Sequence, residues 1–177
     1  MNNIVDVTDI DIFYISFDEP NMEENWADLK SKCPWAKRTH GVYGSDAAHK
    51  ACAEASDTER FISVDGDNVV DPAFFDQVIN FSEADVNLEN SVISWCGKNS
   101  INGLVYGNGG IKCWPVEYVK NMKTHEIAED EGSQVDFCWD LNYIQMNDAF
   151  SLVVNNDTPY QAYSCLLYTS PSPRDLA

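Results

Sequence analysis

Apolar and polar positions alternate in blocks that predict short strands and helices over the first half of the chain. Asp11–Phe17 is an apolar and aromatic run bounded by polar residues, which is typical of a core strand. Asn21 follows a turn and is expected to cap an amphipathic helix that Pro34 ends. The same reasoning predicts three further elements: a strand within Ala36–Tyr43, a helix over Ala47–Ala55 and a strand over Arg60–Val64.

This order of elements predicts the fold class. Strands and helices that alternate along a chain form a mainly parallel sheet with helices on its faces, so we expect an α/β, Rossmann-like domain. Asp71, as a capping residue before a proline, predicts a further helix over Pro72–Phe81. The second half is less regular, and its expected elements are strands over Ser91–Cys96, Leu104–Tyr106, Ile111–Trp114 and Phe150–Val154, with a helix from Pro115 to about Met122.

The charge of the chain narrows its range of partners. The 177 residues include 29 acidic and 11 basic side chains, and this formal net charge of −18 argues against binding to nucleic acid or to an anionic membrane surface. No apolar stretch has the length of a membrane span and the N-terminus lacks the profile of a signal peptide, so a cytoplasmic protein is expected. The six cysteines include no CxxC pair, which favours reduced thiols over a zinc site or a disulfide framework.

The segment Val64–Asn68, with the sequence Val-Asp-Gly-Asp-Asn, is the most informative motif. Asp65 and Asp67 stand two residues apart at the end of a predicted buried strand, so both carboxylates project to one side and can share a hard divalent cation that also holds a diphosphate. In open α/β sheets, ligands bind outside the carboxyl ends of the strands, where this turn is expected. The alternative is a polar turn without a ligand, because Asp, Gly and Asn are common turn residues.

With these residues in view, the sequence resembles a known family. The strand Asp11–Phe17, Arg38 before an Ala-rich helix, and the run Phe61–Asn68 are together similar to the nucleotide-binding half of GT-A glycosyltransferases, notably those of the family 2 type. The resemblance covers residues 9–80 well and the following part loosely. It implies a nucleotide sugar as donor, Mn²⁺ or Mg²⁺ held on the diphosphate by a DxD turn, and a second-half carboxylate that acts on the hydroxyl of a glycan or other acceptor.

Carried over residue by residue, the resemblance makes Asp65 and Asp67 the metal ligands. Asp18 and Glu19, which end the first strand, would lie near the base or ribose, although a role as turn and capping acids is an equal alternative. Cationic or protonable side chains are rare in so acidic a chain, and three of them are therefore candidates for phosphate contact, with solvated surface positions as the alternative: Arg38, His49 and Lys50.

The acceptor side is assigned to the second half of the domain, residues 90–164. Gly109 and Gly110, in a Gly-Asn-Gly-Gly turn, would let backbone amides approach the donor sugar or the acceptor, with a hairpin turn as the alternative. An inverting transfer needs a carboxylate base. Asp136 is the leading candidate because its apolar neighbours would order it and raise its pKa. Its rivals are acidic residues of the preceding segment: Glu126, Glu129, Asp130 and Glu131.

The end of the chain differs from the rest in composition. Residues 165–175, Cys-Leu-Leu-Tyr-Thr-Ser-Pro-Ser-Pro-Arg-Asp, have no apolar periodicity and resemble the in-frame translation of a transposase-type sequencing-library adaptor. We therefore expect a GT-A-like domain over residues 1–164, a non-native tail over residues 165–177, and a natural protein that continues beyond Ser164. On this interpretation the sequence is a metagenomic fragment whose fold is incomplete at the C-terminus.

The leading hypothesis is a metal-dependent glycosyltransferase of the hexosyltransferase class, which moves a sugar from a nucleotide-sugar donor to an acceptor hydroxyl. A nucleotidyltransferase would need a Gly-rich loop with Lys or Arg after its first strand, and Phe17–Asn21 does not provide one. The competing hypothesis is a catalytically inactive GT-A-like module that serves in binding or in association with a virion.

Overall fold

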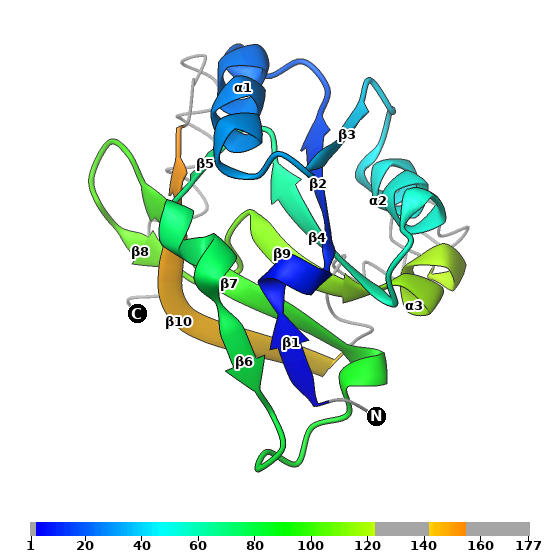
Figure 1. Ribbon diagram of the computed structural model, residues 1–177. Helices are drawn as coiled ribbons and strands as arrows, with labels where there is room; N and C mark the ends of the chain where they lie inside the picture. The colour runs from blue at the N-terminus through cyan, green and yellow to red at the C-terminus, as the bar shows by residue number, and fades with distance from the viewer. Residues whose placement is uncertain (1–2, 123–141, 155–177) are drawn as a thin grey trace, which may run out of the picture.

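The computed structural model describes residues 3–122 and 142–154 (Figure 1). Within these residues, one large sheet has eight strands, and β1 and β6 form a separate two-stranded sheet. The elements in chain order are β1 (Ile4–Asp6), η1 (Val7–Asp9), β2 (Asp11–Ser16), α1 (Met22–Lys32), β3 (Lys37–His40), α2 (Ser45–Ala55), β4 (Arg60–Asp65), β5 (Asn68–Val70), η2 (Pro72–Asp76), β6 (Val78–Asn80), η3 (Leu88–Asn90), β7 (Ser91–Asn99), β8 (Val105–Tyr106), β9 (Ile111–Pro115), α3 (Val116–Asn121) and β10 (Asn142–Val153).

The large sheet is parallel in its first part and mixed in the rest. Strands β3, β2 and β4 lie side by side in parallel, as their alternation with helices predicts. β9 then pairs antiparallel with β4 and β7, while β10 pairs parallel with β7 and antiparallel with β5. The α/β class is confirmed, whereas a mainly parallel sheet describes only part of the molecule. The reason is that the short connections between β7, β8 and β9 contain no crossover helix, which parallel neighbours require.

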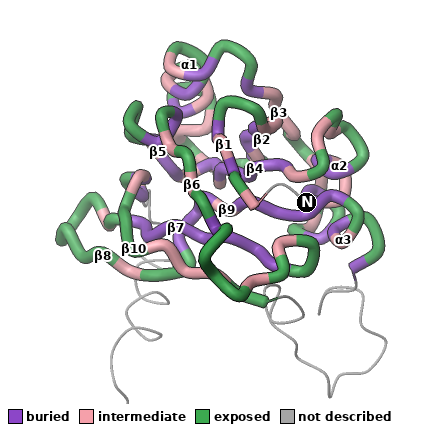
Figure 2. Tube along the Cα trace, turned by 60° about the horizontal axis from the view of Figure 1, so that its bottom comes forward, coloured by how far each residue is buried: buried purple, intermediate pink, exposed green. Residues whose placement is uncertain are grey.

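Helices cover both faces of the large sheet (Figure 1). Along β4, Ile62 and Val64 pack in one core cluster with Leu29 of α1. Phe61 points to the opposite face and packs with Cys52 of α2, as the alternation of side chains along a strand requires. Figure 2 shows that the buried positions follow the strands of this sheet. Within residues 3–122 and 142–154, no helix combines the length and apolarity that crossing a bilayer requires.

The elements predicted before residue 65 are all present, with small shifts at their ends. The helix predicted over Pro72–Phe81 is wrong. Asp71 does cap a helical turn, accepting a hydrogen bond of 2.9 Å from the amide of Ala73, but this 3₁₀-helix lasts only five residues. The chain then enters β6, where Val78 and Ile79 pair with β1. Their branched side chains favour a strand, and the partner strand comes from the distant N-terminus, which a local pattern does not reveal.

Candidate functional site

The segment of residues 65–68, here called the acidic turn, lies at the carboxyl end of β4, which is an interior strand of the large sheet (Figure 1). Asp65 is the last residue of β4, and Asp67 directly precedes β5. β2 and β9 flank β4 on its two sides. The amide of Asp65 donates a hydrogen bond of 2.9 Å to the carbonyl oxygen of Gly110, just before β9. The turn therefore occupies the edge of an α/β sheet at which ligands bind.

The carbonyl group of Gly66, between the two aspartates, is held by side chains from β2 and α1. The hydroxyl of Tyr14 donates a hydrogen bond of 2.6 Å to this oxygen, and the side-chain amide of Asn25 donates a second bond of 3.0 Å. Burial raises the pKa of Tyr14, so its hydroxyl keeps the proton that the bond requires. The ring of Tyr14 is fully buried and stacks on Trp26 at 5.7 Å. The turn is thus anchored in the protein core.

Gly66 is also the point at which a third carboxylate meets the turn. A Cβ atom on Gly66 would lie 2.7 Å from the carboxyl carbon of Glu19, closer than such atoms approach, and 3.0 Å from the carbonyl oxygen of Ile15, which is a tight contact. Glu19 is held in place by the amide of Phe17, which donates to its carboxylate at 2.8 Å. The residue between the aspartates must therefore be glycine for Glu19 to pack here, and the structure brings Glu19 to the acidic turn.

Burial disfavours ionisation of both aspartates. Burial raises the pKa of Asp65, with Lys112 opposing the effect and Glu19 adding to it. Burial also raises the pKa of Asp67 to about 6, and the charge of Asp65 adds to this shift while a hydrogen bond from Asn68 opposes it. Carboxylates that repel each other in a buried position are stabilised by a cation between them.

The residues of the turn fit a hard divalent cation. Asp65 and Asp67 offer carboxylate oxygens, the donors that Mg²⁺ and Mn²⁺ prefer. Asn68, which is 2% exposed, donates to the Asp67 carboxylate at 2.6 Å, and its own side-chain oxygen is buried without a hydrogen-bond partner. In the part of the chain that the structure describes, no group of three or more His, Cys, Asp or Glu side chains converges on one metal position. Among the described residues, Asp65 and Asp67 are therefore the two acids that we assign to a cation.

The glycine-rich turn before β9 is packed against neighbouring strands. The amide of Gly109 donates a hydrogen bond of 3.0 Å to the carbonyl oxygen of Trp95, and a Cβ on Gly109 would lie 2.5 Å from the amide nitrogen of Gly97. Gly110 is in close contact with the side chain of Asn68. The small size of both glycines therefore allows protein segments to approach each other, and the structure gives no support to a contact of the Gly109 amide with a donor or an acceptor.

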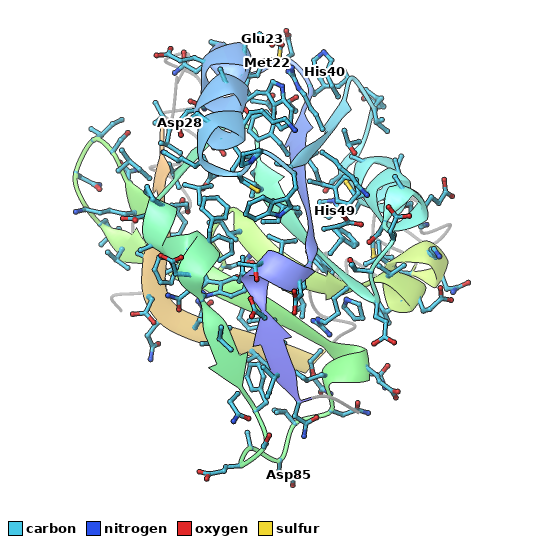
Figure 3. All side chains as sticks on the ribbon, in the orientation of Figure 1. Met22, Glu23, Asp28, His40, His49 and Asp85 are labelled. Atoms are coloured by element: carbon cyan, nitrogen blue, oxygen red, sulfur yellow. The ribbon has the colours of Figure 1, made fainter. Side chains whose placement is uncertain are left out.

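The basic residues named from the sequence all have partners within the protein. Arg38 lies on β3 and binds both carboxylate oxygens of Glu23, at 2.7 and 3.0 Å. Lys50 pairs with Asp46 at 2.8 Å. His49 is 7% exposed and packs edge-on against a tryptophan ring of the core. Figure 3 shows His49 between α2 and the sheet, far from Glu23 at the end of α1. Phosphate contacts by these three residues stay a prediction.

Sequence reasoning missed several residues that the structure places at the acidic turn. Tyr14 and Asn25 donate hydrogen bonds to the carbonyl oxygen of Gly66, from which they are 52 and 41 residues apart in the sequence. Lys112 on β9 donates a hydrogen bond of 2.7 Å to the carbonyl oxygen of Gly109 and acts electrostatically on Asp65. Only the register between β4 and β9 identifies Lys112, and no local motif in the sequence specifies that register.

The remaining predicted residues are not tested by the structure. Asp18 is exposed in the loop after β2, next to Glu19, and its contact with the base or ribose stays a prediction. The predicted base, Asp136, falls outside the described residues, as does the tail from residue 165 onward. The same holds for the rival bases: Glu126, Glu129, Asp130 and Glu131.

Comparison with known proteins gives likeness only at the level of structure. No family model matches the chain, and no curated protein matches it. A glycosyltransferase involved in the glycosylation of the major capsid of PBCV-1 is 13% identical, with 90% of this chain and 100% of that one covered and a TM-score of 0.45. HddC from Yersinia pseudotuberculosis is 10% identical over 92% and 80%, with a TM-score of 0.42. A putative glucose-1-phosphate thymidylyltransferase from Bacillus anthracis is 15% identical over 92% and 78%, with a TM-score of 0.40.

Proposed function

We propose that this chain is a GT-A-like glycosyltransferase domain that uses a nucleotide sugar and a divalent cation. The observation that carries the proposal is the acidic turn itself. Asp65 ends an interior strand at the carboxyl edge of the sheet and Asp67 comes two residues later; burial raises the pKa of both, and the charge of Asp65 adds to the shift of Asp67. A structural turn without a ligand would gain nothing from two acids held in this way, whereas a cation would compensate them.

The donor would lie along the carboxyl ends of β3, β2 and β4. The rings of Phe17 and Tyr43 meet edge to face at 5.9 Å just beyond β2 and β3, and they are 48% and 86% exposed. An exposed aromatic surface at this edge suits the stacking of a nucleobase. The diphosphate would then reach the acidic turn, where Mn²⁺ or Mg²⁺ on Asp65 and Asp67 would neutralise charge on the departing group.

The acceptor would approach from the side of the second half of the chain. In the transfer, the acceptor hydroxyl oxygen forms a bond to the anomeric carbon as the bond from that carbon to the diphosphate breaks. The acceptor proton passes to a carboxylate base, for which Asp136 is our leading proposal, with Glu126 and Asp130 among its rivals. The base must be a further residue because Asp65 and Asp67 are assigned to the cation.

The experiment is isothermal titration of the chain with UDP, GDP and dTDP, each with Mn²⁺ and with EDTA. We expect heat of binding for at least one nucleotide in Mn²⁺ only, and we expect Asp67→Asn to abolish it. Asp85→Asn is the matched control, because Asp85 is exposed at the opposite end of the molecule (Figure 3).

A second assay, release of free sugar from the matching nucleotide sugars, separates an enzyme from an inactive binding module. Binding without any turnover of donor, with or without acceptor, favours the module. Absence of metal-dependent binding for every nucleotide would contradict the proposed function.

A further inference from the structure

Lys112 lies on the same face of the sheet as the first aspartate of the acidic turn. On β9 it pairs with Ser63 of β4, and directly opposed residues of antiparallel strands project to the same face. Ser63 and Asp65 stand two residues apart on β4 and also share a face. The indole nitrogen of Trp114, two residues after Lys112, donates a hydrogen bond of 2.9 Å to the hydroxyl of Ser63, which agrees with this orientation.

The ammonium group of Lys112 is held close to the carboxyl end of β4. It donates a hydrogen bond of 2.7 Å to the carbonyl oxygen of Gly109. The neighbouring carbonyl, that of Gly110, accepts the amide of Asp65. Lys112 is half-buried, and its positive charge lowers the pKa of Asp65 against the effect of burial. The lysine is therefore an internal cation of the acidic turn.

Arg38 on β3 differs from Lys112 because a carboxylate neutralises it: it binds Glu23 through two hydrogen bonds. The hydrogen bond described for Lys112 is to a backbone carbonyl, which leaves its charge available. An ammonium group has three N–H donors, and the bond to Gly109 uses one of them.

A diphosphate at this site would be repelled by several carboxylates. Glu19, Asp65 and Asp67 meet at the turn, and one divalent cation balances only part of their charge and that of the ligand. We propose that Lys112 binds a non-bridging oxygen of the donor diphosphate through its ammonium group. The inference rests on the proposed function and adds to it a binding residue for the pyrophosphate group, whatever the base and sugar.

A purely structural role for Lys112, tying β9 to the turn before it, predicts different behaviour. Loss of a structural tie would disturb the turn and weaken the binding of metal and of diphosphate together. If Lys112 instead binds the diphosphate, its loss should affect diphosphate binding and Mn²⁺ binding in opposite ways. Diphosphate would bind more weakly, and Mn²⁺ alone would bind equally well or more tightly because a positive charge beside Asp65 has gone.

The experiment compares wild type, Lys112→Met, Lys112→Arg and Lys120→Met by isothermal titration, first with Mn²⁺ alone and then with an equimolar complex of Mn²⁺ and pyrophosphate. Met keeps most of the length of the apolar stem. Lys120 is an exposed lysine on α3 that pairs with Glu117 and serves as the matched control. Pyrophosphate is the probe because its binding does not depend on the base.

We expect Lys112→Met to bind the pyrophosphate complex about ten- to a hundredfold more weakly, the size of one charge-assisted hydrogen bond. Its affinity for Mn²⁺ alone should be unchanged or higher, and Lys112→Arg should retain most of the pyrophosphate affinity. Equal pyrophosphate binding by wild type and Lys112→Met would overturn the inference and leave the proposed function intact. A parallel loss of both affinities would also overturn it. Failure of the wild type to bind pyrophosphate with Mn²⁺ would contradict the proposed function as well.

Discussion

The hydroxyl of Tyr14 and the carbonyl oxygen of Gly66 form a hydrogen bond of 2.6 Å that joins the core of β2 to the turn carrying Asp65 and Asp67. The donor is fully buried, so the bond is shielded from water. The backbone segment that carries the two aspartates is thus stabilised by a fully buried side chain of β2.

Tyr14→Phe removes this donor and leaves Asn25 as the described partner of the Gly66 carbonyl. We expect a loss of about 0.5–1.5 kcal/mol in the free energy of unfolding, measured by urea denaturation. Binding of Mn²⁺ with nucleotide should weaken as well, because the turn is less well ordered. Ser82→Ala, at an exposed position, is the control and should change neither quantity. Unaltered stability of Tyr14→Phe would show that the hydrogen bond does not anchor the turn.

Gly66→Ala should destabilise the protein through its contact with Glu19. The added methyl group would lie 2.7 Å from the Glu19 carboxyl carbon and 3.0 Å from the backbone oxygen of Ile15, so the glutamate must move. We expect a loss of about 1 kcal/mol, the low end of the range for overpacking, because the nearest atoms belong to the end of a flexible side chain. Shortening the glutamate in the double variant Gly66→Ala/Glu19→Ala should restore part of it. A double-mutant cycle with no coupling between the two positions would contradict the close packing.

The stability of the metal-free protein should fall as the pH rises past the pKa of Asp67. This pKa is raised to about 6 in the folded chain, mainly by burial and then by Asp65, whereas an unfolded aspartate titrates near about 3.9. Because the folded state holds the proton more tightly, the stabilisation is complete below about pH 4 and is lost between about pH 4 and 6. Asp65, whose pKa is raised in the same direction, adds to the trend.

Asp67→Asn isolates this contribution, because an amide does not titrate. In EDTA the variant should become more stable relative to wild type as the pH rises from 4 to 7, by up to about 3 kcal/mol in the free energy of unfolding. Urea denaturation at several pH values measures the difference. Adding Mn²⁺ at pH 7 should stabilise wild type only. A difference between the two proteins that is constant with pH would mean that Asp67 is not buried as described.

The parts of the fold that follow from local patterns could be predicted from the sequence. The apolar run of β2, the capped amphipathic helix α1 and the strand β4 each carry their signal in a few neighbouring residues. The position of Asp65 at the end of a strand follows from the same kind of signal, since the apolar run before it stops at the acidic residues.

The remaining parts depend on pairings between distant segments. β6 forms because β1 lies beside it, and the approach of Glu19 to Gly66 depends on how the loop after β2 folds over β4. Lys112 meets the turn through the register of β9 on β4. A shift of one residue in that register would place Lys112 on the other face of the sheet, so the local sequence does not determine its role.

The final prediction concerns the general base. If Asp136 takes the acceptor proton, Asp136→Asn should lower the rate of sugar transfer by about 10²–10⁴-fold, the usual contribution of a positioned base. The affinity for nucleotide with Mn²⁺ should hardly change, because that binding is assigned to Asp65 and Asp67 at the end of β4. Transfer rates and titrations of Asp136→Asn, Glu126→Gln and Asp130→Asn in parallel identify the residue, since only the base shows a large loss of turnover with intact donor binding. If Asp136→Asn transfers sugar at the wild-type rate, Asp136 is not the base. The base is then the acid whose substitution lowers turnover and leaves donor binding intact. Glu129 and Glu131 are the next two residues to substitute.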